Sequence, residues 1–170
     1  MSPKDLLCAD CLQQIEWINP QERCVHCFAP APCRLCKTSP RPLRPHRSVF
    51  EGVGPVRSLY DDFLRTKRAD PLASLLLLAW TRASFPCPDA IVPATLKIFP
   101  QQDPAYLLAK AVSRLLRCPL LLPRASLQDK SLLLITPILQ NLDETLDIKN
   151  ALRGAFPRSL YSLALIDLRT

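Results

Sequence analysis

Six of the eight cysteines form three Cys-x-x-Cys pairs near the start of this 170-residue chain. The pairs are Cys8 and Cys11, Cys24 and Cys27, and Cys33 and Cys36. A Cys-x-x-Cys turn presents two thiolates from one tight bend, and two such turns complete a tetrahedral Zn²⁺ site. A segment this short buries little core, so metal binding supplies much of its folding free energy. The sequence therefore predicts a structural zinc site.

Three pairs provide six thiols, whereas one zinc ion needs four. The set that we favour is Cys8, Cys11, Cys24 and Cys27. Twelve residues separate Cys11 from Cys24, which is enough for these two pairs to fold back on each other. Only five residues, including two prolines, separate Cys27 from Cys33. Cys33 and Cys36 remain an alternative pair of ligands.

The surroundings of these cysteines favour metal over disulfides. The start of the chain, MSPKDLLCADC, lacks the apolar region of a secretory signal peptide. The most apolar stretch, Leu72 to Trp80, is too short to span a bilayer and is followed by Arg82. We therefore expect a cytoplasmic protein without membrane insertion, in a compartment that keeps thiols reduced.

A second stretch with possible chemistry runs from Leu132 to Leu146 and reads LLLITPILQNLDETL. Its apolar start indicates a buried strand over Leu132 to Ile135, and the later part indicates a helix from about Asp143 to Arg153. Many phosphate-binding enzymes place their ligand at such a strand-loop-helix junction. This loop, however, contains no glycine.

The rest of the chain alternates strands and helices. We expect strands at 48–53, 90–93, 119–123 and 160–168, and helices from Pro55, from Pro71 to Arg82, and from Pro104 to Arg117. Asp70 and Asp103 are the expected N-caps of the last two helices. Alternation of this kind predicts an α/β fold with a parallel sheet flanked by helices.

Composition places the chain among globular proteins, with 48% hydrophobic residues and a formal net charge of +7. We expect a zinc-binding unit with a proline- and arginine-rich linker over residues 1–47, and an α/β domain over residues 48–170. The positive charge suits a polyanionic partner such as DNA.

Together with the cysteine pairs, several segments resemble the ComF family, whose members combine a zinc finger with a type I phosphoribosyltransferase-like domain. The segment Ser48–Leu59 is similar to that family's short strand and following helix, and Thr66–Arg68 lies near its basic turn. The order from Ile91–Pro93 through the Leu107–Ala109 helix to a late strand-loop-helix is also similar. The resemblance covers nearly the whole chain and implies a link to competence and DNA uptake.

The family's donor site is degenerate in this sequence. The resemblance implies two acids and a Thr-Thr-Gly-x-Thr loop that hold phosphoribosyl pyrophosphate (PRPP) with Mg²⁺. Here Thr136-Pro137 replaces the acids, and Gln140 to Glu144 replaces the loop. Proline removes an amide donor, and the two acids that end this run would repel a phosphate dianion. They suit the first turn of a helix better.

A second family motif, Arg-Gly-Phe-Asn-Gln, is replaced by Pro100 to Pro104. The side chains best able to form an altered donor site are Thr136, Asn141, Thr145 and Lys97. We therefore expect a ComF-like binding or assembly module without a working PRPP site, whose partners are DNA or proteins of DNA uptake and recombination. The alternative is an active phosphoribosyltransferase with an altered donor site.

Overall fold

The computed structural model describes residues 10, 13–25, 27–33, 36, 46–123, 125–140 and 142–169, and only the backbone of residues 142–144. Its elements, in chain order, are η2 (Pro20–Glu22), β1 (His46–Glu51), α3 (Gly54–Thr66), α4 (Asp70–Arg82), β2 (Ala90–Pro93), α5 (Pro104–Leu116), β3 (Ser131–Leu139), α6 (Leu142–Arg153) and β4 (Ser159–Asp167). The four strands form one parallel sheet in the order β1-β4-β3-β2. The predicted α/β class is confirmed at this level.

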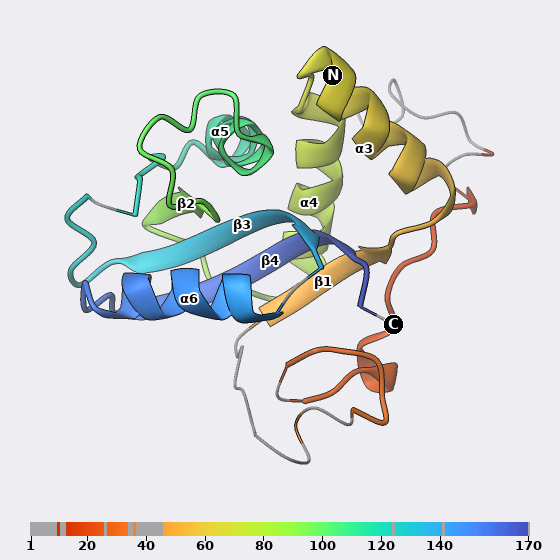
Figure 1. The fold of residues 1–170 in the computed structure, drawn as a ribbon, viewed down its shortest axis with the longest axis horizontal. Coiled ribbons are helices and arrows are strands. Elements are labelled where there is room, and N and C mark those ends of the chain that lie inside the picture. The colour runs from red at the N-terminus through yellow and green to blue at the C-terminus, as the bar shows by residue number, and fades with distance from the viewer. Residues whose placement is uncertain are drawn as a thin grey trace.

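Helices cover both faces of the sheet (Figure 1), with α3, α4 and α5 on one face and α6 on the other. The central strands β3 and β4 are therefore buried on both sides, as their continuous apolar runs require. Leu133 and Ile135 contribute to the core beneath the three helices, whereas Leu132 and Leu134 face the smaller core near α6.

The strand predicted from Leu132 to Ile135 extends to Leu139, because its later residues continue the pairing with β4. Thr136 lies beside Ala164, and Leu139 lies beside Asp167. Since α6 begins at Leu142, only residues 140 and 141 connect strand to helix. The junction is therefore short.

Local signals predicted some helix ends correctly and others not. The Asp103 side chain accepts a hydrogen bond from the amide of Ala105 at 2.9 Å, which confirms it as the N-cap of α5. Asp70, in contrast, is the first residue of α4 and pairs with Arg114 on α5 at 3.0 Å. The strand expected at residues 119–123 is reduced to a single bridge between Leu120 and Ile91.

Polar groups are buried between β1, β4 and the helix α6. His46 is 2% exposed, and its two ring nitrogens lie 2.9 Å from the Ser162 hydroxyl and 3.1 Å from the Ser48 hydroxyl. Burial and the nearby positive charges of Arg169, Lys149 and Arg47 hold the pKa of His46 well below its usual value. Lys149 is itself 1% exposed, and burial together with Arg153 lowers its pKa to about 8.

This environment predicts a specific loss of stability in acid. Because the pKa of His46 is lowered in the folded state, the unfolded chain takes up the proton first as the pH falls below about 6.5. Stability from this group is complete above that pH and declines below it. We expect His46→Gln, which stays neutral, to show a smaller decrease in Tm between about pH 7 and pH 5 than the parent. An equal decrease in both proteins would contradict a neutral, buried His46.

Candidate metal centre and a second cavity

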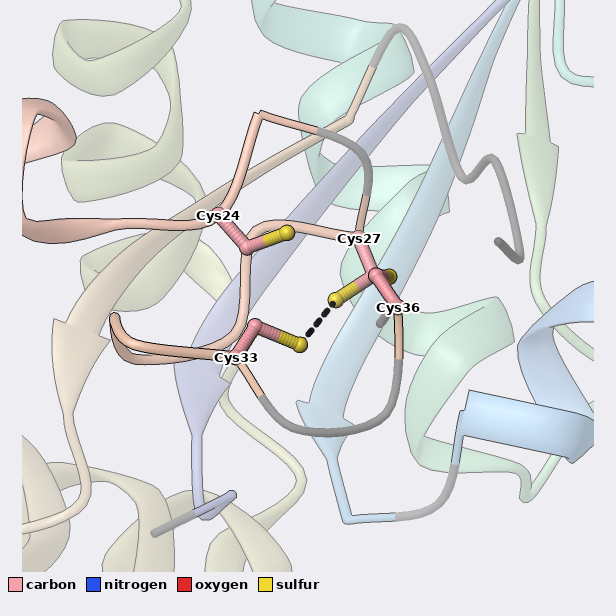
Figure 2. A group of neighbouring side chains, drawn as sticks. All are labelled: Cys24, Cys27, Cys33 and Cys36. Carbon is pink, nitrogen blue, oxygen red and sulfur yellow. Dashed lines mark hydrogen bonds between the residues drawn. The ribbon is translucent and has the colours of Figure 1, made fainter. Parts of the chain in front are cut away.

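Four cysteine side chains meet beside the sheet (Figure 2): Cys24, Cys27, Cys33 and Cys36. Their sulfur atoms all lie within 4.8 Å of one another, and the Sγ atoms of Cys27 and Cys33 are 3.5 Å apart. A tetrahedral zinc ion with Zn–S bonds of about 2.3 Å would set sulfur–sulfur distances of about 3.8 Å. The group can therefore hold one metal ion, and its soft sulfur ligands are compatible with a structural zinc.

The first pair of ligands lies on a tight turn. The amide of Cys24 donates to the carbonyl of Ala29 at 2.8 Å, and the amide of Phe28 donates to the carbonyl of Cys24 at 2.9 Å. Phe28 takes a left-handed backbone conformation with φ of 60°. An isolated antiparallel bridge joins Arg23 to Pro30, so the chain turns back on itself at Cys24 and Cys27. The short, proline-containing spacer thus brings Cys33 near Cys27.

Burial makes the uncharged thiol the favoured form of Cys27 while no metal is bound. Its side chain is completely buried, and this burial is the largest cause that raises the pKa of the thiol. Hydrogen bonds with the neighbouring cysteines act in the same direction, whereas one with the backbone of Ala29 opposes them. Metal binding would release this proton, which makes affinity depend on pH.

Two arginines fasten the cysteine segment to the ends of the edge strand and its neighbour. Arg23, immediately before Cys24, pairs with Glu51 at the end of β1. Arg169 donates to the carbonyl of Cys27 at 2.9 Å and forms two bonds with the fully buried carboxylate of Asp167, at 2.6 and 2.8 Å. Leu146 of α6 packs against the cysteines. The segment is therefore anchored to the rest of the protein by two arginines and by an apolar contact with α6.

The sequence predicted part of this group. Cys24 and Cys27 belong to it, and the alternative pair Cys33 and Cys36 completes it. Cys8 and Cys11 lie outside the described residues, so the set favoured from the sequence stays a prediction. The sequence analysis did not identify Arg23 and Arg169 as supports of this group. Arg23 is next to Cys24, but its partner Glu51 is distant in sequence. Arg169 is 142 residues from Cys27, so no local pattern connects the two.

The residues proposed for an altered donor site are only partly brought together. Thr136 and Thr145 line one cavity of about 240 Å³ at the carboxyl end of β3, together with Tyr60 and Asp103. Lys97 is exposed, and its amino group pairs with Asp103 at 2.8 Å, an interaction that raises the pKa of Lys97. Asn141 lies outside the described residues.

The charge of this second cavity is unfavourable for phosphate. Among the described residues that line it, Asp103 is the one charged side chain. Thr136 is 7% exposed, and its hydroxyl oxygen has no hydrogen-bond partner in the described part of the chain. The cavity thus offers hydroxyl groups and a carboxylate, but no lining cation, to a bound molecule.

Comparison with known proteins gives no match: no protein-family model fits the chain, and no curated protein or solved structure is significantly similar to it. Within the described residues, no helix has both the length and the apolarity needed to cross a membrane.

The metal centre can be tested by replacing single ligands. We expect Cys27→Ser or Cys33→Ser to reduce bound zinc from about one ion per chain to near zero and to lower Tm, because each removes one of four sulfur ligands. Metal content is measured by elemental analysis of the purified protein. Cys87→Ser is the matched control, since Cys87 is exposed and outside the group.

The same measurement on Cys8→Ser and Cys11→Ser separates the two ligand sets. Full zinc content in both variants would assign the metal to the four cysteines brought together here. Loss of zinc in these variants, with retention in Cys33→Ser, would instead assign it to the set favoured from the sequence.

Proposed function

We propose that this protein is a ComF-like, zinc-stabilised α/β binding module of the cytoplasm that does not transfer phosphoribosyl groups. The observation that carries this proposal is the chemistry at the carboxyl end of β3. Ligands of open α/β sheets bind at the carboxyl ends of the strands, so a donor site would lie there. Its cavity is lined by a carboxylate and lacks a lining cation among the described residues.

The backbone of the junction supports the same proposal. A phosphate cradle needs several amides that point at one anion from a loop and a helix start. Here two residues connect β3 to α6, and Pro137, which has no amide hydrogen, stands where the family has an acid. A ligand with a pyrophosphate group would also meet the carboxylate of Asp103. The nearby cation, the exposed Lys97, is already paired with that carboxylate.

Calorimetry with PRPP and Mg²⁺ tests the proposal directly. We expect no binding at concentrations up to about 1 mM, because no described side chain of the cavity compensates the charge of the ligand. Micromolar binding would contradict the proposal, provided that Thr136→Ala and Thr145→Ala abolish it. Those two variants remove cavity hydroxyls without changing charge, and therefore show whether binding takes place in this cavity.

The partner that we propose is DNA, with the proteins of DNA uptake and recombination as the setting implied by the ComF resemblance. The net charge of +7 favours a polyanion, and this charge includes the arginines of the predicted linker. The linker was predicted to extend to residue 47, but His46 and Arg47 belong to β1. Arg41 and Arg44 of the linker lie outside the described residues. Binding of this type depends on phosphate neutralisation and not on base sequence.

If the protein binds DNA in this way, its affinity for DNA should depend steeply on the salt concentration. The logarithm of the association constant, measured by anisotropy of a labelled duplex, should fall linearly with log salt between about 50 and 200 mM. The double variant Arg41→Gln/Arg44→Gln should reduce the slope by about two. Arg65→Gln/Arg114→Gln is the matched control, because both of its arginines are exposed and already pair with carboxylates. A flat salt response would contradict DNA binding.

A further inference from the structure

A larger cavity, of about 400 Å³, lies beside the edge strand β1, between the cysteine segment and the end of α4. It is separate from the cavity at the carboxyl end of β3, and the two share no lining residue. Its walls include two aromatic side chains, two arginines and several aliphatic groups, among them Trp17, Phe28, Arg47, Arg82, Val49 and Leu163. This volume is in the range of small-molecule sites, which extend from about 300 to 1,000 Å³.

Each arginine of this cavity lies over one of its aromatic rings. The guanidinium carbon of Arg82 lies 3.9 Å from the centre of the Trp17 ring, and that of Arg47 lies 5.1 Å from the centre of the Phe28 ring. Stacking uses the flat face of a guanidinium and leaves its N–H groups at the edge, where they can bind an oxyanion. It also limits side-chain freedom, which lowers the entropic cost of binding.

The two arginines differ in how much of their hydrogen-bonding capacity is already used. Arg47 is half-buried and donates to the carbonyl of His46 at 2.9 Å. Arg82 is exposed and holds its charge over the indole, whereas the exposed Arg57, Arg65 and Arg114 pair with carboxylates. Arg82 is therefore the better primary contact for an incoming anion.

The local charge favours an anion in spite of the nearby helix end. The cavity is next to the carboxyl end of α4, where the helix dipole is equivalent to about half a negative charge. Two arginines line the cavity, and no acidic residue is among its described lining residues. Two full positive charges outweigh that half charge, so the net potential in the cavity is positive.

We propose that this cavity binds a small organic anion, with a carboxylate or phosphate on Arg82 and Arg47 and a compact apolar body against Val49 and Leu163. The aliphatic wall excludes water, and the arginine edges fix the orientation of the charged group. The proposal is independent of the function proposed above, because it concerns a different cavity.

Phenyl phosphate is a suitable probe, since it combines the two required parts. We expect a saturable shift of the Trp17 indole signal in ¹H–¹⁵N spectra, recorded in a Trp80→Phe background so that only one indole remains. Inorganic phosphate and phenol, which each carry one of the two parts, should bind at least about tenfold more weakly. Equal binding of inorganic phosphate would mean a general anion effect and would overturn the proposal.

Variants locate the binding. Arg82→Gln should weaken phenyl phosphate by about tenfold or more, the usual loss for a charge-assisted hydrogen bond. Arg114→Gln is the matched control: it removes an equal charge from an exposed helical arginine far from this cavity and should have no effect. Ala83→Leu reduces the volume without changing charge, and should also weaken binding. Unchanged affinity in both Arg82→Gln and Ala83→Leu would overturn the proposal.

Discussion

The guanidinium of Arg169 connects the cysteine segment to the end of β4. It donates one hydrogen bond to the carbonyl of Cys27 and two hydrogen bonds to the carboxylate of Asp167, whose side chain is fully buried. An ion pair in such a place is costly unless its geometry satisfies both partners, and removal of one partner leaves a buried charge. Together with the pair between Arg23 and Glu51, this contact positions the cysteine segment against the sheet and the wall that the segment adds to the larger cavity.

A bound metal ion and the two arginines would both stabilise the cysteine segment. The cysteine segment has a very small apolar cluster of its own, consisting of Cys27 and Ala29 with a few half-buried neighbours. Metal coordination can supply the missing folding free energy inside the segment. Arg23 and Arg169 then fix the segment to the ends of β1 and β4. Metal loss is therefore expected to affect the surface beside β1 as well as the cysteines themselves.

The charged residues that line the two cavities differ in sign. The one at the carboxyl end of β3 contains Asp103, while the one beside β1 contains Arg47 and Arg82. An α/β sheet usually binds phosphates at the carboxyl ends of its strands. In this chain the lining cations lie instead where the cysteine segment covers the edge strand. This distribution agrees with our proposal that an organic anion binds beside β1 and not at the carboxyl end of β3.

The sequence by itself determined the features that depend on near neighbours. Alternating apolar segments predicted the parallel α/β fold, Asp103 was recognised as an N-cap, and the spacing of Cys24 and Cys27 marked two members of the group that can hold a metal ion. Only the tertiary structure showed that Cys33 and Cys36 lie beside them, that β3 continues past Thr136, and that Arg82 lies over Trp17. The physical reason is that caps and turns are set by contacts a few residues apart. Ligand sets, strand lengths and stacked charges depend on segments that meet only when the sheet has formed.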